Sequence, residues 1–191
     1  MPNPLLFRAP MTRRLRRLGL KGADVTVGLA AEAIGVGGDD GTLLRLNFAG
    51  IARIRVGFSE SKGGSYHFTR IWLTGERRPI EFMGSITTPA AYSAFVRGMV
   101  AWVLERYPGI EVQAGSGWFM PLFTIGAFGA MSLASLGGSI YLAVTGDDWT
   151  IFLGALAVSL VLLLGLGFWT WTRHRPRRIA TVEALARVLP A

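Results

Sequence analysis

Two long stretches without a charged residue constrain this chain more than any other feature. Residues 112–146 are 35 consecutive uncharged residues and residues 149–172 are 24, with only Asp147 and Asp148 between them. A helix that crosses a membrane needs about 20 mostly apolar residues. The sequence therefore predicts two transmembrane helices, residues 118–144 and 149–172, joined by a tight turn, and it excludes a wholly soluble protein.

The distribution of charge predicts which side of the membrane each part occupies. Residues 1–111 have a formal charge of +6 and residues 173–191 have +4, whereas the two residues between the predicted spans contribute −2. Positively charged flanks stay in the cytoplasm, and short acidic loops cross the membrane. We therefore expect two spans with both termini on the cytoplasmic side.

A basic cluster directly follows the second predicted span. Its first role is to fix the orientation of that span. Its second possible role is to bind anionic lipid headgroups, at about 1 kcal/mol per charge near the membrane surface. The cluster consists of Arg173, Arg175, Arg177 and Arg178.

Alternating apolar and polar residues between positions 23 and 84 predict β-strands. A period of two is typical of antiparallel strands with one buried face. Turn sequences rich in Gly, Asp and Ser separate the runs, so we expect about six short strands joined mostly by hairpins. The clearest runs place Val25, Val27 and Leu29, then Leu44, Leu46 and Phe48, and then Ala52, Ile54, Val56 and Phe58 on the buried face.

An amphipathic helix is expected after these strands. Thr88 is a suitable N-cap, Pro89 suits the first helical position, and Pro108 with Gly109 ends the pattern. Apolar side chains recur at helical spacing, so one broad face is expected to cover an open sheet. This face contains Tyr92, Phe95, Val96, Met99, Trp102 and Val103.

Two basic terminal segments, residues 1–22 and 173–191, each have two interpretations. Each contains a short apolar stripe that would lie either on an anionic membrane surface or on the neighbouring domain. The stripes are Met11, Leu15 and Leu18 in the first segment, and Ile179, Val182, Leu185 and Leu189 in the second.

Two segments resemble bacterial pleckstrin-homology-like (PH-like) domains. Residues 48–58 (FAGIARIRVGF) are similar to a recurring strand of that family, although Gly50 stands where the family often has Asp, and residues 91–102 (AYSAFVRGMVAW) are similar to its closing helix. The resemblance covers residues 23–107, a little under half of the chain.

The resemblance implies an α+β membrane protein of the bacterial cytoplasmic (inner) membrane. Its PH-like antiparallel β-barrel, residues 23–111, would be closed by a C-terminal helix and followed by two transmembrane α-helices. The family further implies a binding or assembly module rather than a catalyst.

A row of small residues is the first candidate site. Gly126, Ala130, Ala134 and Gly138 recur every fourth residue in the first predicted span. Small residues let the backbones of membrane helices approach one another closely. The row would pack either on the second span of the same chain, through Gly154, Ala155 and Ser159, or on another subunit.

A group of arginines is the second candidate site. If the expected register is right, Arg45, Arg53 and Arg55 share one side of neighbouring strands. Three guanidinium groups can hold a phosphate group or an acidic partner. The alternative is an ordinary solvated face.

The residues give no support for catalytic chemistry. His67 and His174 each lack a second ligand at metal-binding spacing, and the chain has no Cys and no nucleotide-binding glycine motif. We therefore expect no catalytic, cofactor-binding or metal-binding residues. The expected partners are other membrane proteins or a second copy of this chain, and anionic phospholipid headgroups, but not nucleic acid.

These expectations give two main functional interpretations and a weaker third one, an enzyme with a site at the membrane face for which the sequence names no catalytic residues. The first is a non-enzymatic integral membrane protein that acts as an assembly or accessory subunit of a membrane complex, through a PH-like domain and the small-residue face of its first span. The alternative is a membrane-anchored sensor that binds an anionic lipid or a phosphate ligand through a basic face of that domain.

Overall fold

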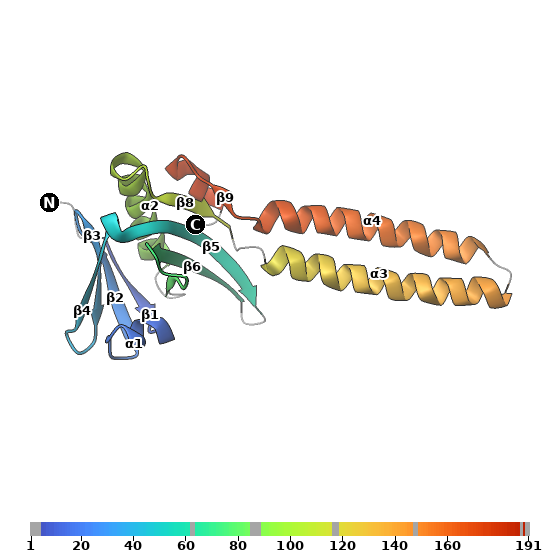
Figure 1. The fold of residues 1–191 in the computed structure, drawn as a ribbon, viewed down its shortest axis with the longest axis horizontal. Helices are drawn as coiled ribbons and strands as arrows, with labels where there is room; N and C mark the ends of the chain where they lie inside the picture. The colour runs from blue at the N-terminus through green and yellow to red at the C-terminus, as the bar shows by residue number, and fades with distance from the viewer. Residues whose placement is uncertain are drawn as a thin grey trace. The chain divides into compact units, whose positions relative to one another are not determined.

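The computed structural model divides the chain into two compact units, shown in Figure 1. The first unit is Met1–Gly115 with Pro176–Ala191, and the second is Ser116–Arg175. The structure describes residues 5–61, 64–84, 89–115, 119–146, 149–187 and 189. In the first unit the elements are β1 (Leu6–Pro10), α1 (Arg13–Arg17), β2 (Asp24–Leu29), β3 (Ala33–Gly38), β4 (Leu43–Asn47), η1 (Phe48–Gly50), β5 (Ile51–Ser61), β6 (Gly64–Leu73), β7 (Ile80–Met83), α2 (Pro89–Arg106), β8 (Glu111–Ala114), β9 (Arg177–Arg178) and η2 (Val182–Arg187).

The first sheet is an antiparallel meander of four strands in the order β1-β2-β3-β4. The predicted buried faces of β2 and β4 are confirmed, since Val25, Val27 and Leu46 are buried and Leu44 packs against the core. Two of its strands, β1 and β3, were not expected from the sequence. Pro10 in β1 and the Gly residues in β3 obscure the alternation that predicts a strand.

The second sheet has five strands in the order β7-β6-β5-β8-β9. Its first three strands form a second antiparallel meander, and β8 adds to β5 in parallel. A β-bulge between Ile51 and Arg53 reverses the expected burial at the start of β5. Ile51 is therefore buried and Ala52 exposed, the opposite of the prediction, whereas Ile54 and Val56 are buried as expected.

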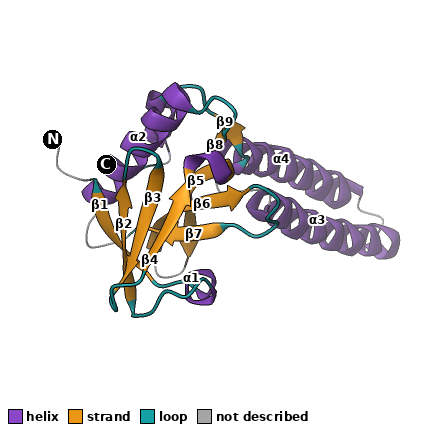
Figure 2. Cartoon of the chain, turned by 60° about the vertical axis from the view of Figure 1, so that its left-hand side comes forward, coloured by secondary structure: helices purple, strands orange, loops and turns teal. Residues whose placement is uncertain are grey.

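In the part of the chain that the structure describes, the strands form two open sheets, and the expected closed barrel is not observed. The short turn η1 carries the chain from β4 into a different sheet, so β4 and β5 pair with different neighbours. Figure 2 shows these two sheets with α2. Five of the six residues predicted for the inner face of α2 are buried, and Trp102 is partly buried. The predicted N-cap, Thr88, lies outside the described residues.

Both terminal segments belong to the first unit, which therefore extends beyond the predicted 23–111 domain. Leu15 of α1 is fully buried and Met11 packs against the core, so the stripe of residues 1–22 lies mainly on the domain. After the second unit the chain returns to form β9, and the Ile179 N–H donates to the Val112 carbonyl over 3.0 Å. Three of the four predicted tail residues, Ile179, Leu185 and Leu189, are buried in the core of this unit.

The second unit is a pair of packed helices, α3 (Phe119–Gly146) and α4 (Trp149–His174), which lie side by side in Figure 1. Among the described residues, one segment is long and apolar enough to cross a membrane by length and composition. This segment is Leu122–Tyr141 of α3, with 20 residues and a mean hydropathy of 1.4. The apolar segment of α4, Leu156–Thr172, is shorter. Trp118 and the predicted turn residues Asp147 and Asp148 lie outside the described residues.

Candidate functional site

The structure separates Arg45 from the other two arginines of the predicted basic face. Arg45 lies on β4 of the first sheet, where its side chain is exposed and its Nη2 is 4.0 Å from Glu32 Oε2. Arg53 and Arg55 lie on β5 of the second sheet. The expectation that all three share one face is therefore wrong, because the chain changes sheets at η1.

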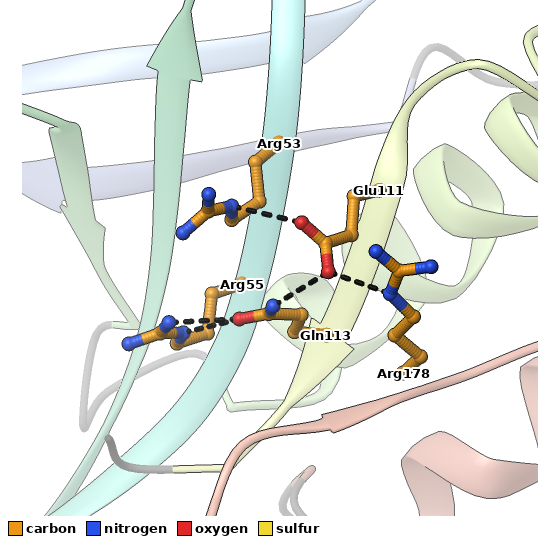
Figure 3. Close-up of polar contacts among 5 residues, drawn as sticks. All are labelled: Arg53, Arg55, Glu111, Gln113 and Arg178. Atoms are coloured by element: carbon orange, nitrogen blue, oxygen red, sulfur yellow. Dashed lines mark hydrogen bonds and ion pairs between the residues drawn. The ribbon is translucent and has the colours of Figure 1, made fainter. Parts of the chain in front are cut away.

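Arg53 and Arg55 instead face a polar network on β8 and β9, drawn in Figure 3. Arg53 Nε forms an ion pair with Glu111 Oε2 over 3.1 Å, but its N–H is not aligned for a hydrogen bond. Arg178 Nε donates to Glu111 Oε1 over 2.7 Å. Gln113 Nε2 also donates to Glu111 Oε1, over 2.9 Å, and this leaves Gln113 Oε1 facing Arg55.

Glu111 is the anionic centre of this network. Hydrogen bonds from Gln113 and Arg178 lower the pKa of its carboxyl group below the ordinary value, and the positive charges of Arg178 and Arg53 lower it further. Its side chain is 23% exposed, so these partners are only partly screened by solvent. One carboxylate on β8 therefore connects cations on β5 and on β9.

Arg55 differs from its neighbours because its hydrogen-bond partner is neutral. Its Nε and Nη2 donate to Gln113 Oε1 over 3.0 and 2.7 Å. Burial lowers the pKa of Arg55, and the nearby charges of Arg53 and Arg70 lower it further. Arg55 is thus a partly buried cation next to two further cations.

Two residues of β6 complete this face, and both were missed in the sequence. The guanidinium carbons of Arg53 and Arg55 lie 5.5 and 5.2 Å from the ring centroid of Trp72, within cation–π range. Arg70 lies directly opposite Arg55 in the strand register and forms an ion pair with Glu81. Arg70 and Trp72 are two positions apart on β6, so alternation along this strand could have assigned them to one face. The parallel pairing of β8 with β5 has no comparable local pattern in the sequence that would predict it.

The structure describes three side chains of the basic cluster predicted after the second span, those of Arg175, Arg177 and Arg178. Arg178 joins the Glu111 network, and Arg177 is its neighbour on β9. Arg175 is exposed and belongs to the second unit, whose last residue it is. Nothing is described of the Arg173 side chain, although its backbone lies in α4.

The small-residue row of α3 lies on the side of the helix that faces away from α4. The less exposed positions of α3 include Phe128, Ser132, Leu136 and Ser139, which are spaced to form one face. With 3.6 residues per turn, positions two apart lie on nearly opposite sides of a helix. Gly126, Ala130, Ala134 and Gly138 each lie two positions from Phe128, Ser132 or Leu136, and all four are exposed.

The geometry of the glycines agrees with this placement. Among the described residues, no atom lies within 4 Å of the Cβ that a side chain at Gly126 or Gly138 would have. A Cβ at Gly167 of α4, by contrast, would lie 3.7 Å from Ile125 of α3. Of the predicted partners in α4, Ser159 is buried but Gly154 is exposed and in open space, and the Ala155 side chain is outside the described residues. In the described part of the two helices, packing of the row on α4 is therefore not observed.

Comparison with known proteins adds no assignment to this geometry. Neither a scan against protein-family models nor a search of curated proteins finds a match to the chain.

Proposed function

We propose that this chain is a non-enzymatic assembly module of the bacterial cytoplasmic membrane. A PH-like domain in the cytoplasm is tethered by two membrane spans, and the exposed face of α3 binds a further transmembrane helix. That helix belongs to another membrane protein or to a second copy of the chain.

The path of the chain supports two spans rather than one. β8 ends at Ala114, immediately before the helical pair, and β9 begins at Arg177, immediately after it. These two strands are hydrogen-bonded neighbours in one sheet, so both ends of the helical pair start from the same folded unit. A folded unit occupies one side of a membrane. If α3 crosses, α4 therefore has to cross back.

The length of α4 is compatible with this topology. Its 26 residues correspond to about 39 Å of helix, more than the roughly 30 Å thickness of a bilayer's hydrocarbon core. Residues 149–172 contain no charged side chain. The positive charge of the first unit favours the cytoplasmic side for both ends.

The order of elements supports the PH-like interpretation. Two successive antiparallel meanders, β1–β4 and β5–β7, are followed by one long helix, α2, that packs into their common core. Strands β8 and β9 extend the second sheet beyond this arrangement. The resemblance noted in residues 48–58 and 91–102 covers η1 with most of β5, and the middle of α2.

The position of the small-residue row is the observation that carries the proposal. Transmembrane helices associate through small residues that allow close backbone contact. The row of α3 is turned away from α4 and is exposed, so it is available to a helix from outside this chain.

The test is affinity purification of the full-length protein in mild detergent, with mass spectrometry of co-eluting proteins. Gly138→Leu and Ala130→Leu are expected to reduce recovery of the partner, because a large side chain separates the two backbones. Gly165→Leu is the matched control, since Gly165 is exposed on α4 and no atom of the described residues lies within 4 Å of its Cβ position. Equal recovery with all three variants, or equal loss, contradicts the assignment of the α3 face.

A further inference from the structure

One row of polar side chains crosses the whole outer face of the second sheet. The strand register aligns Arg70 of β6 with Arg55 of β5, and Arg55 with Gln113 of β8. The same register aligns Glu81 of β7 with Arg70 and Arg178 of β9 with Gln113. The row thus has a cation at one end, a carboxylate at the other, and two arginines side by side between them.

The two adjacent arginines have an electrostatic cost. Like charges directly opposite each other on neighbouring strands destabilise a sheet. Glu81 offsets the charge of Arg70, and Glu111 is shared by Arg53 and Arg178. Arg55 has a neutral amide as its hydrogen-bond partner. The four arginines therefore exceed the two carboxylates, and the excess positive charge is centred on Arg55.

The hydrogen-bonding groups of these arginines are only partly used. Arg55 donates through Nε and Nη2, and Arg70 pairs with Glu81 through Nε. For Nη1 of Arg55 and for the Nη groups of Arg53 and Arg70, no acceptor is found among the described residues. Figure 3 shows that the terminal nitrogens of Arg53, and the terminal nitrogen of Arg55 that is not bonded to Gln113, point toward the same side, away from Glu111 and Gln113.

Trp72 positions two of these guanidinium groups. Its ring lies within cation–π range of Arg53 and Arg55, and such contacts favour a defined orientation of a planar cation. The neutral partner Gln113 is itself held by Glu111. Arg55 is therefore held on both sides before any ligand binds.

We propose that Arg53 and Arg55, oriented by Trp72, bind one phosphate group together with Arg70 on the outer face of the second sheet. Guanidinium groups donate paired N–H bonds that match phosphate oxygens. A phosphate bound here supplies the negative charge that Arg55 lacks and relieves its repulsion with Arg70. The ligand class is a phosphate ester, either the headgroup of an anionic phospholipid or a soluble phosphorylated molecule. This site does not depend on the α3 face or on the assembly proposal.

The test uses full-length protein in a neutral detergent and isothermal titration calorimetry. The probes are short-chain phosphatidylglycerol, inorganic phosphate and short-chain phosphatidylcholine, whose zwitterionic headgroup is the control. We expect phosphatidylglycerol, inorganic phosphate or both to bind, and phosphatidylcholine not to bind. Binding of phosphatidylglycerol alone identifies a lipid headgroup as the source, and binding of inorganic phosphate identifies a site open to soluble ligands.

Two charge-removing variants distinguish this site from general attraction by a basic protein. Arg55→Met keeps the apolar stem of the side chain and is expected to weaken binding at least about tenfold, because it removes charge-assisted hydrogen bonds. Arg97→Met removes a charge from an exposed position on α2 and is expected to leave binding unchanged. Equal binding by Arg55→Met and the wild-type protein, or no binding of either anionic probe by the wild-type protein, overturns the proposal.

If Arg55→Met loses binding, a stability measurement distinguishes loss of the binding site from loss of the fold. Arg55→Met removes a like-charge pair, so its thermal midpoint without ligand is expected to equal or exceed that of the wild-type protein. Loss of binding with an unchanged or raised midpoint supports the site. If the midpoint falls, Arg53→Met is measured instead, and unchanged binding by that variant also overturns the proposal.

Discussion

Arg178 donates a hydrogen bond to Glu111 across 2.7 Å, although 67 positions of sequence separate the two residues. Glu111 lies on the last strand before the helical pair, and Arg178 lies on the first strand after it. The hydrogen bond therefore joins the two strands of the first unit between which the chain forms the helical pair. Removing the tail from this unit would leave β8 as an exposed edge of the second sheet.

Apolar burial should hold the tail more strongly than this ion pair does. The Arg178 side chain is 81% exposed, and exposed ion pairs contribute about 1 kcal/mol or less. Leu185 is fully buried in the core of the first unit, where a Leu→Ala change costs about 2–5 kcal/mol. We therefore expect Leu185→Ala to lower the free energy of unfolding much more than Arg178→Ala, measured by urea titration of the full-length protein in detergent. A larger effect of Arg178→Ala contradicts this view of the tail.

Glu111 should make the stability of the first unit depend on pH. Its folded-state pKa lies below the ordinary value of 4.5, so its ionised form stabilises the fold above that pH. This contribution is lost as the pH falls through the folded-state pKa. Glu111→Gln is therefore expected to lower the urea midpoint at pH 7, and the difference from the wild-type protein should shrink as the pH falls below 4.5.

Glu105→Gln is the control for this pH dependence, since Glu105 is exposed on α2. Its difference from the wild-type protein should be small at every pH. A Glu111→Gln effect that stays constant from pH 7 to the acid range would show that the carboxylate charge does not stabilise the fold.

The membrane topology can be tested because the chain has no Cys. Single Cys substitutions at Ala101 and Ala186 report on exposed positions of the first unit, and Asp147→Cys reports on the segment between α3 and α4. In intact spheroplasts, a membrane-impermeant maleimide is expected to label Asp147→Cys alone. Permeabilised spheroplasts should give labelling at all three positions.

The comparison between Ala101 and Ala186 is the decisive part of this measurement. Both positions belong to one folded unit, one before and one after the helical pair. Labelling of Ala186→Cys together with Asp147→Cys in intact spheroplasts would place the two parts of this unit on opposite sides and contradict two spans.

The sequence predicted most of the elements that have strong periodicity. Six strands, β2 to β7, occupy the region expected for about six, and α2 buries the expected face. β3 was not identified because Gly35, Gly37 and Gly38 supply no side chains for an alternating pattern. β8 has only four residues, and its parallel partner is more than 50 positions away, so no local pattern predicts it.

The candidate sites show the same limit. Alternation correctly predicted that Arg53 and Arg55 share one face of β5, since it is a local property of one strand. The assignment of Arg45 to that face failed because it depended on which strands are neighbours. Likewise, the four-residue spacing identified the small row of α3, but only the packing of α3 on α4 shows which side the row occupies.

A close backbone approach at Gly57 should be essential for the placement of β8. A Cβ at this position would lie 2.5 Å from the Gly115 carbonyl oxygen and 2.7 Å from Cζ of Phe68. Gly115 cannot move freely away, because its N–H donates to the Val56 carbonyl over 2.8 Å. Gly57→Ala is therefore expected to destabilise the first unit by about 1–3 kcal/mol through overpacking.

Gly50→Ala is the matched control for this substitution. In the part of the chain that the structure describes, no atom lies within 4 Å of a Cβ at Gly50, and the backbone of Gly50 does not have a positive φ angle. A Gly→Ala change at such a position is neutral or stabilises the fold slightly, because it restricts the unfolded chain. Gly57→Ala is therefore expected to lower the urea midpoint relative to the wild-type protein. Gly50→Ala is expected to leave it unchanged or to raise it slightly. Equal urea midpoints for Gly57→Ala and Gly50→Ala would show that the close approach between Gly57 of β5 and Gly115 at the end of β8 is not required for the stability of the first unit.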